Sequence, residues 1–420
     1  MINFADTGFI LVCAAMVCLM TPALAVFYAG LLRKGNIVDI MFQCFIAMGI
    51  VTVLWFIGGF SLIFGGDISG IIGNLEFAFL QNVSLAPSEI WAPTIPFIAF
   101  FIFQLMFALV TPALICGAVA ERMTLKSYMV FLTLWSLLVY IPVAHWVWGG
   151  GFLSQMGLAD FAGGTVVHMS AGFSALAAVL VVGGRKKRDY TPHNMVYVAI
   201  GAGLLWFGWF AFNGGSALAA NEIAAMTITN SQISAGFGLM TWVIASWIQE
   251  KHPSVLGAMM GALAGLVCIT PGSGFVEPWA AAIIGVVGTL CCYGMIQLRI
   301  KKDLDDTLDV FGLHGVGGTV GIIMTGIFAS PAINAVTGVI YGNPGQLLTQ
   351  LAGAAIVMIY SFVLTVIMLK NNRPLYTAKG FRAVGDRRNR RGLLSGKRND
   401  RVKSVYIFAA LPILAGRCCF

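Results

Sequence analysis

The chain contains the stretch Asp160-Phe-Ala-Gly-Gly-Thr-Val-Val-His168-Met-Ser-Ala-Gly172, which places an imidazole inside a glycine-rich apolar segment. A second stretch, Asp306-Thr-Leu-Asp-Val-Phe-Gly-Leu-His314-Gly-Val-Gly-Gly318, repeats the pattern of an Asp eight residues before a His and a Gly four residues after it. Burying a histidine in an apolar segment is costly, and such a residue by default marks a transport path or a proton relay. Two matching histidines therefore predict a shared functional site.

Composition identifies the class of protein. The chain has 420 residues, of which 59% are hydrophobic and only 10% are charged, whereas about 25% are charged in a soluble domain. Its 50 glycines suit helices that pack closely in lipid. The nine cysteines lack metal-ligand spacing, and the chain has no Walker motif, dinucleotide fingerprint or nucleophile triad in a suitable context. We therefore expect a polytopic membrane protein that is not an enzyme and uses no cofactor or metal.

The apolar segments predict an all-α protein with eleven transmembrane helices. Each segment is long enough to cross a hydrocarbon layer of roughly 30 Å. They cover about 8–31, 38–64, 97–120, 127–147, 161–183, 194–217, 226–249, 255–274, 279–298, 309–329 and 346–369. Residues 1–370 thus form one membrane domain, and residues 371–420 form a basic tail.

The basic residues predict the orientation. All 25 Lys and Arg fall in alternate connections, such as 185–188 and 299–302, or after the last span. The opposite loops carry acids instead, including Asp67 and Glu277. Because Lys and Arg favour the cytoplasmic side, we expect the N-terminus outside and the C-terminus in the cytoplasm of a cell inner (plasma) membrane. The net charge of +8 is then a signal of topology and gives no support to nucleic-acid binding.

This orientation predicts an inverted repeat. Asp160 would begin its span at the outer face and Asp306 at the inner face, so the two helices run antiparallel. Eight helical residues rise about 12 Å, which brings both histidines near the middle of the bilayer. Spans one to five (about 8–183) and six to ten (194–329) would be halves of opposite topology, as in many transporters. The eleventh span (346–369) lies outside the repeat.

Each candidate residue also has a structural interpretation. His168 and His314 face each other across a pore, where imidazoles can share or pass a proton, or they are unrelated buried histidines bonded to nearby carbonyls. The interpretation of the two histidines as a metal site has less support, because no third ligand is expected at their depth in the membrane. Asp160 caps the fifth span through backbone N–H groups, and it can also lend negative potential to a cation site at the outer mouth. Asp306 can cap the tenth span in the same way.

Aromatic residues gather at the outer ends of three spans. They occur in the runs Phe97-Ile-Ala-Phe-Phe-Ile-Phe103-Gln-Leu-Met-Phe107, His145-Trp-Val-Trp148 and Trp206-Phe-Gly-Trp209-Phe-Ala-Phe212-Asn-Gly-Gly-Ser216. Interfacial anchoring and packing explain many such residues. Aromatic faces also attract cations, by about 0.5–2 kcal/mol, so a cation site at the outer mouth is the functional interpretation.

These motifs closely resemble the ammonium transporter (Amt) family. The resemblance runs from about residue 5 to 370 and rests on Trp148-Gly-Gly-Gly, Asp160 to His168, Gly208 to Ser216 with Asn221-Glu-Ile-Ala-Ala, and Asp309 to His314-Gly. It implies a homotrimer of eleven-span protomers, each with its own pore, in the lipid bilayer. Trp148 favours this branch over the related Rhesus proteins, which lack that Trp.

The resemblance also implies roles for particular residues. Seven positions carry the family's pathway side chains: Phe107, Trp148 and Ser216 with Asp160 at an outer recruitment site, Phe107 and Phe212 at a stacked gate below it, and His168 and His314 in the pore. The implied function is to recruit NH4+, remove its water or its proton, and conduct NH3 while excluding K+. Methylammonium would be an analogue of the substrate, and a cytoplasmic PII-type (GlnK-like) regulator would be a partner.

The tail departs from the family pattern. Residues 371–420 hold twelve basic residues and two acids, whereas family tails are acidic, and the segment reads like the family tail translated in a shifted frame. Two other functions fit the membrane domain: a channel for another small neutral solute, which would not need the residues of the recruitment site, and an ammonium sensor. A sensor would be expected to carry a signalling domain after its last span, and about fifty residues are too few for a catalytic output domain.

Overall fold

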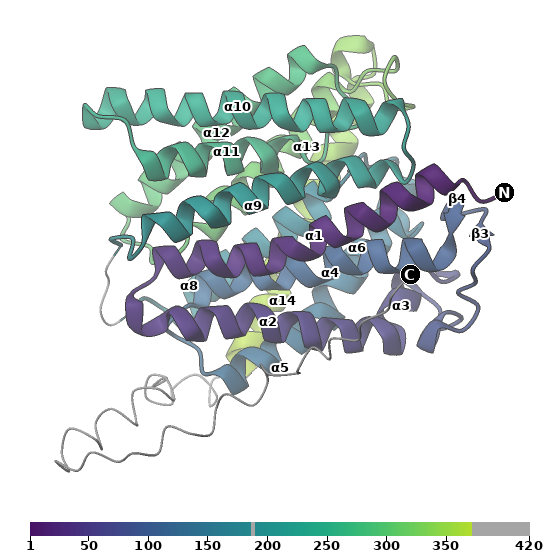
Figure 1. Ribbon diagram of the computed structural model, residues 1–420, viewed down its shortest axis with the longest axis horizontal. Helices are drawn as coiled ribbons and strands as arrows, with labels where there is room; N and C mark the ends of the chain where they lie inside the picture. Colours follow the sequence, from purple (N-terminus) through teal and green to yellow (C-terminus); the bar gives the residue numbers. More distant parts are fainter. Residues whose placement is uncertain (186–189, 372–420) are drawn as a thin grey trace, which may run out of the picture. The chain divides into compact units, whose positions relative to one another are not determined.

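A computed structural model describes residues 1–185 and 190–371 of the chain. The basic tail after Asn371, including its predicted departure from the family, lies outside the described residues, as do three of the four basic residues expected at 185–188. Long helices dominate the described part, and they lie roughly side by side along one direction (Figure 1).

The eleven predicted spans correspond to eleven helical segments, of which two are divided by a wider π-helical turn and two begin with one. In chain order these are α1 (Phe4–Leu31); α2 (Ile37–Leu54) with η2 (Trp55–Gly59) and α3 (Phe60–Phe64); α4 (Phe97–Val119); α5 (Leu125–Trp135) with η4 (Ser136–Tyr140) and α6 (Ile141–Trp148); η5 (Gly164–Met169) with α8 (Ser170–Val182); α9 (Met195–Gly214); α10 (Glu222–Glu250); α11 (Val255–Ile269); α12 (Pro278–Lys301); η7 (Phe311–Gly315) with α13 (Val316–Phe328); and α14 (Pro344–Asn371). The predicted all-α class and the eleven spans are confirmed.

Nine of these segments are long and apolar enough to cross a bilayer by composition alone, within the described residues. Helix α11 is shorter, with 15 residues. Helix α10 is long but carries Asn, Gln, Ser and Thr side chains. Two of these bond to α11 and the loop after it: Ser234 donates to the Gly265 carbonyl at 2.8 Å, and Asn230 donates to the Ser273 carbonyl at 2.9 Å. Such bonds let polar residues remain in a membrane helix.

Side-chain caps explain where several helices begin. Asn3, Asn194, Asn221 and Ser254 each precede a helix and accept from N–H groups of its first turn. Residues 65–96, which the sequence left unassigned, form short antiparallel hairpins of β1 (Asp67–Ile68) with β2 (Ile72–Gly73) and β3 (Pro87–Ser88) with β4 (Ala92–Pro96). A short helix, α7 (Phe152–Gln155), follows α6.

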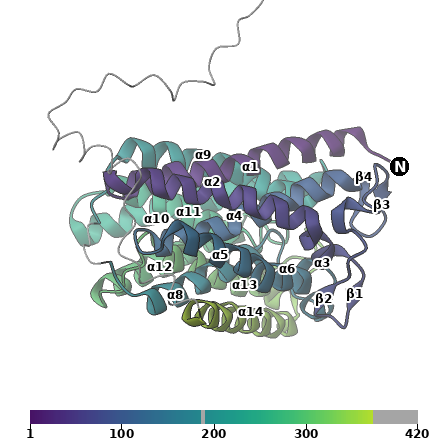
Figure 2. The ribbon, with the colours of Figure 1, turned by 90° about the horizontal axis from the view of Figure 1, so that it is seen from below.

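Close packing joins the two predicted halves. Helix α1 runs along α9 (Figure 1), and glycines permit this approach because a Cβ at Gly201 would overlap the backbone of Phe27. In the view from below, α14 lies along one side of the bundle (Figure 2), where it packs against α8 and α13. The packing suits an inverted repeat, which remains a prediction.

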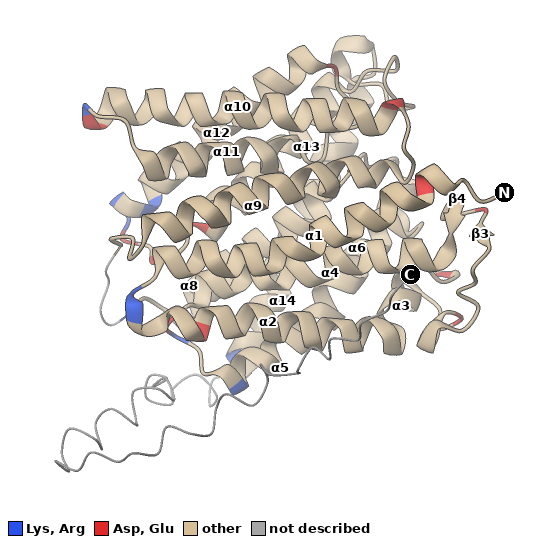
Figure 3. Ribbon diagram, in the orientation of Figure 1, with Lys and Arg blue, Asp and Glu red and all other residues tan. Residues whose placement is uncertain are grey.

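Charge separates the two ends of this bundle. The Lys and Arg of the described residues gather at one end, opposite the N-terminus and the β-hairpins (Figure 3). We call the end with Lys and Arg the inner end and the other the outer end. The segregation seen in the sequence is therefore a property of the folded bundle, and the assignment of these ends to cytoplasm and exterior remains a prediction from the positive-inside rule.

Candidate functional site: a pathway through two histidines

A cavity of about 290 Å³ opens at the outer end. Phe107 of α4, Trp148 at the end of α6 and Ser216 in the single turn η6 (Gly215–Ala217) all line it, so the structure brings together three residues that are far apart in sequence. The Ser216 hydroxyl donates to the Phe212 carbonyl at 2.8 Å, which leaves its oxygen able to accept from a ligand in the cavity.

The indole of Trp148 is held in place by the loop before the fifth span. Its N–H donates to the backbone carbonyl of Asp160 at 3.0 Å, and the Trp148 ring meets Phe107 edge to face with the ring centres 5.7 Å apart. Trp148 therefore presents its ring to the cavity from a fixed position.

The Asp160 side chain is a buried helix cap, as its structural interpretation predicted. The carboxylate accepts from the N–H groups of Gly163, Gly164 and Thr165 at 2.9, 2.6 and 2.7 Å, and also from the Thr165 hydroxyl. Burial raises the pKa of Asp160, and these hydrogen bonds oppose the rise. The helical turn begins at Gly164 rather than at residue 161, because residues 160–163 form the cap.

Two phenylalanines separate the outer cavity from the interior. Phe107 lines the outer cavity and Phe212 lines a smaller cavity below it. The two ring centres are 4.4 Å apart and the planes are tilted by 44°. The rings therefore touch as the prediction of a gate requires, although they are tilted rather than parallel.

The inner of these two cavities holds both predicted histidines. Its volume of about 30 Å³ exceeds the roughly 10–15 Å³ that a cavity needs to hold one water molecule. The Nδ1 atoms of His168 and His314 are 3.2 Å apart, a distance at which one ring donates a hydrogen bond to the other. The prediction that the two rings face each other is confirmed, and apolar side chains such as Leu24, Val110 and Leu263 form much of the surrounding wall.

Two aromatic rings stack on His168. Trp209 stacks on it with ring centres 5.5 Å apart, and Phe212 does so at 6.0 Å. The indole of Trp209 donates to the Thr270 hydroxyl at 2.9 Å. The Nε2 atom of His168 is buried and has no hydrogen-bond partner within residues 1–185 and 190–371.

The backbone brings the two histidines together by the same means on both sides. Each lies in a π-helical turn, η5 for His168 and η7 for His314. A Cβ on Gly172 would overlap the backbone of Gly315, and a Cβ on Gly318 would lie 2.7 Å from the carbonyl oxygen of Gly164. The glycine four residues after each histidine is therefore the point where the other helix passes.

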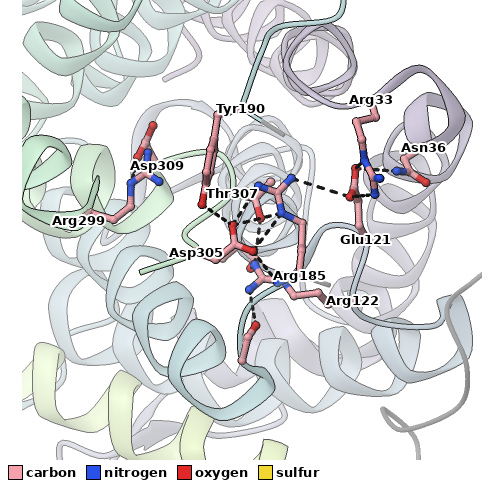
Figure 4. A network of polar contacts seen from close by, with 12 residues as sticks. Arg33, Asn36, Glu121, Arg122, Arg185, Tyr190, Arg299, Asp305, Thr307 and Asp309 are labelled. Carbon is pink, nitrogen blue, oxygen red and sulfur yellow. Dashed lines mark hydrogen bonds and ion pairs between the residues drawn. The ribbon is translucent and has the colours of Figure 1, made fainter. Parts of the chain in front are cut away.

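The inner end differs from the outer end because charged side chains line its cavity. A cavity of about 230 Å³ is lined there by Arg185, Trp242, Tyr293, Arg299 and Asp309, and Leu308 lines both this cavity and the one with the histidines. Around it runs the polar network of Figure 4. Nε of Arg299 lies 2.7 Å from a carboxylate oxygen of Asp309, and burial raises the pKa of Asp309 to about 7 although Arg299 opposes the rise.

Arginines tie this network together. The Arg185 guanidinium donates to Asp305 at 3.0 Å, and the Arg185 backbone N–H donates to the same carboxylate at 2.6 Å (Figure 4). Burial raises the pKa of Asp305, but the hydrogen bonds from Arg185 outweigh burial and hold that pKa below its usual range. Arg33 pairs with Glu121 within the first predicted half. The Arg185–Asp305 pair joins the loop after the first half to the second half.

Sequence reasoning missed the difference between His145 and the pore histidines. His145 is buried, but its Nδ1 lies 2.7 Å from the Ile63 carbonyl oxygen and its Nε2 2.9 Å from a carboxylate oxygen of Asp67. It therefore joins α6 to the β1 hairpin, away from the lumen. An Asp eight residues earlier distinguishes His168 and His314, because Leu137 occupies that position before His145, whereas a Gly four residues later is common to all three histidines.

The site offers two imidazoles and no further metal ligand. Within the described residues, no group of three or more His, Cys, Asp or Glu side chains is arranged to hold a metal ion. The arrangement suits a small molecule that passes from an aromatic mouth, between two phenyl rings, into a narrow space with imidazole nitrogens.

Comparisons with known proteins identify one family. Residues 8–373 match the model of the Ammonium Transporter Family. The chain is 46% identical over 373 residues to a putative ammonium transporter of Methanothermobacter thermautotrophicus, which covers 88% of this chain and 91% of that protein. It is 43% identical over 372 residues to the ammonium transporter of Bacillus subtilis, with 88% and 92% covered. The crystal structure of Saccharomyces cerevisiae Mep2 matches with a TM-score of 0.85 and 36% identity, over 91% of this chain and 88% of that one.

Proposed function

Because this chain belongs to the ammonium transporter family, we propose that it recruits NH4+ at the outer cavity and conducts NH3 past His168 and His314. The family consists of transporters, so the prediction that the chain is not an enzyme is confirmed. The observation that carries the mechanism is the 3.2 Å contact between the two Nδ1 atoms inside a narrow, mostly apolar cavity.

Recruitment rests on the outer cavity. NH4+ carries a full charge and donates four hydrogen bonds, so a site for it needs electron-rich faces and acceptors. The rings of Trp148 and Phe107 supply the faces, and the Ser216 oxygen is an acceptor beside them. Attraction to an aromatic face is worth about 0.5–2 kcal/mol, which replaces part of the water that the ion loses. Asp160 contributes by holding Trp148 through its carbonyl, and any effect of its negative charge reaches the mouth through space.

Passage of the bare ion is disfavoured below the gate. Isolated charges are very costly in a medium of low dielectric constant, and the cavity with the two histidines is small and mostly apolar. A neutral NH3 fits there and can accept from or donate to imidazole nitrogens. K+ is similar in size to NH4+ but cannot release a proton and become neutral. Separation of NH3 from the proton therefore gives selectivity against K+.

The histidine pair keeps the lumen neutral and polar. If one proton lies between the two Nδ1 atoms, each ring is held in line by the other. The remaining nitrogen atoms are then available to the passing molecule, and His168 Nε2, which is buried without a partner in the described chain, is one of them. The pair thus offers hydrogen bonds without a permanent charge.

The family membership also supports three wider proposals. The functional unit is a homotrimer in which each protomer has its own pore, the two halves are related as an inverted repeat, and a cytoplasmic PII-type protein regulates transport from the inner end. The N-terminus lies outside and the C-terminus inside the plasma membrane. Single cysteines introduced at the outer loop 218–224 and at the inner loop 185–190 test the orientation by side-specific labelling, in a background without reactive native cysteines.

Transport by purified protein in liposomes tests the function. Ammonium and methylammonium should enter at rates that depend on the protein and saturate, while K+ should not enter. Equal permeation of K+ would refute selective recruitment and neutral passage. Failure to transport ammonium at all, in protein shown to be folded, would refute the proposed function as a whole.

A further inference from the structure

Helix α14 lies outside the two predicted halves, yet it carries a fully buried carboxamide. Gln350 is 0% exposed and packs against Gly326 of α13, where a Cβ would meet the Gln350 side chain at 2.8 Å. Burying an amide without hydrogen bonds costs about 1–3 kcal/mol in proteins. The partners of Gln350 therefore show what this helix stabilises.

The two shortest of its hydrogen bonds join Gln350 to both backbone polar groups of one loop residue. Gln350 also accepts from the Gln346 amide at 3.1 Å and donates to the Ile322 carbonyl at 3.4 Å. The Gln350 carbonyl oxygen accepts from the Ala159 N–H at 2.9 Å, and its amide nitrogen donates to the Ala159 carbonyl at 2.7 Å. Ala159 belongs to an irregular segment between α7 and η5, and non-helical backbone is tolerated at membrane depth only where protein satisfies it. A glutamine side chain supplies both bonds in the geometry of a backbone pair.

The loop leads from Ala159 directly to the outer cavity. The next residue, Asp160, receives the indole N–H of Trp148 on its carbonyl, and the residue after that, Phe161, lines the cavity itself. Leu158, on the other side, packs so closely on Gly353 of α14 that a Cβ there would lie 2.6 Å from its side chain. Gln350 is thus connected to the recruitment residue Trp148 through two consecutive backbone units.

We propose that Gln350 is a positioning residue for ammonium recruitment, through which α14 fixes the Asp160 carbonyl and hence the Trp148 ring. The inference rests on the proposed function of Trp148. Without Gln350, the Ala159 groups have no equivalent partner and the loop shifts. The Trp148 ring then loses its fixed orientation, while the gate and the histidine pair, which α14 does not carry, stay in place.

The test compares half-saturating ammonium concentration with maximal rate in liposomes. Gln350→Met keeps the length of the side chain but makes neither bond. We expect half-saturation to rise about three- to tenfold, which corresponds to about 0.7–1.4 kcal/mol, with the maximal rate per folded protein changed less than twofold. Thr365→Val is the matched control, because Thr365 is also buried on α14 and bonds to Ser174 at 2.9 Å, away from the loop. It should leave half-saturation unchanged.

A double variant separates positioning from general stability. Trp148→Leu should raise half-saturation strongly in the wild-type background and only slightly in Gln350→Met, since both changes act on one ring. Independent, multiplying effects, or an unchanged half-saturation in Gln350→Met, would overturn the positioning role. No effect of Trp148→Leu in the wild-type background would instead remove the proposed recruitment site itself.

A second variant covers the case in which Gln350→Met does not fold. A carboxyl group buried in apolar surroundings favours its neutral form, and a neutral Gln350→Glu side chain can both accept from and donate to Ala159. Relative to wild type at each pH, half-saturation of Gln350→Glu should approach the wild-type value as the assay pH is lowered. A half-saturation that stays above the wild-type value as the assay pH is lowered would contradict the two-bond role of Gln350.

Discussion

The segments that begin at Asp160 and at Asp306 share a backbone plan but differ in their surroundings. Both lead into a π-helical turn that carries a histidine, and both have a glycine four residues later where the other helix crosses. The Asp160 carboxylate is saturated by N–H groups of its own turn. The Asp306 carboxylate accepts from Phe311 at 2.8 Å, and its other oxygen has no hydrogen-bond partner within the described chain.

The difference separates the features that bring the two histidines together from the features that distinguish the two mouths. The shared features bring His168 and His314 into contact, so they serve the pore. The features that differ lie at the mouths: aromatic rings beside Trp148 at the outer end, and arginine–carboxylate pairs such as Arg185–Asp305 at the inner end. Within the described residues, no Lys or Arg lines the outer cavity, whereas the inner cavity is lined by arginines that are paired with carboxylates. Variants at equivalent positions test this separation.

The largest effect should come from the shared crossing glycines. Gly172→Ala and Gly318→Ala each place a Cβ against the backbone of the opposite segment, which cannot move without displacing a histidine. We expect a loss of stability at the upper end of the about 1–3 kcal/mol typical of overpacking, together with loss of transport, at both sites. Gly203→Ala, where nothing lies within 4 Å, is the control. Melting temperatures in detergent measure the effect, and a harmless Gly172→Ala would mean that the crossing is not tight.

The next largest effect should be a difference in stability between variants of the two aspartates. Asp160→Ala leaves three buried N–H groups without their acceptor, at about 1–3 kcal/mol for each, whereas Asp306→Ala removes the acceptor of Phe311. Unfolding measurements should therefore show a clearly larger loss of stability for Asp160→Ala than for Asp306→Ala. Equal losses would contradict the difference between the two caps.

Next in size is Trp148→Leu, which acts on the outer mouth only. Removal of the aromatic face should raise half-saturating ammonium about twofold to thirtyfold, the range that corresponds to 0.5–2 kcal/mol. The melting temperature should change little because Trp148 ends its helix at a cavity. Unchanged affinity and selectivity over a wide range of ammonium concentration would refute recruitment through cation–π attraction.

Much of this comparison was predictable from the sequence. Hydropathy located the eleven spans because each must cover the same hydrocarbon thickness. The repeated spacing of Asp, His and Gly predicted that His168 and His314 meet, and they do. Charge alone predicted which loops gather at one end.

The remainder depends on contacts that no local pattern encodes. The π-helical turns η5 and η7 lie where two glycine-bearing helices cross closely, a contact between segments far apart in the sequence. His145 and His168 are both buried imidazoles in apolar segments, and only the fold places Asp67 beside His145. Arg185 and Asp305 are 120 residues apart, and Gln350 and Ala159 are 191 apart. The hairpins of residues 65–96 are too short to show a strand period.

The smallest effect concerns the inner ion pairs and depends on pH. Hydrogen bonds from Arg185 outweigh burial and lower the pKa of Asp305 in the folded chain, so its stabilising contribution is present above the unfolded value of about 3.9 and is lost as pH falls through the folded value. Asp305→Asn should therefore lower the melting temperature by several degrees at neutral pH. The gap to wild type should close below about pH 4. A gap that stays constant with pH would mean that the charge of Asp305 is not what stabilises the inner end.

The central claim is that His168 and His314 form the conducting lumen, and ionic selectivity tests it most directly. His168→Asp, His168→Glu and His314→Glu each put a negative charge into the cavity that the two rings share. His145→Gln is the matched control, because His145 is equally buried but bonds to Ile63 and Asp67 outside that cavity. Currents carried by K+ and by ammonium should be measured on the same folded variants in planar bilayers or liposomes. We expect the three acidic variants to conduct K+ while the control still excludes it. Selectivity against K+ that is unchanged in all three would contradict a pore lined by the histidine pair.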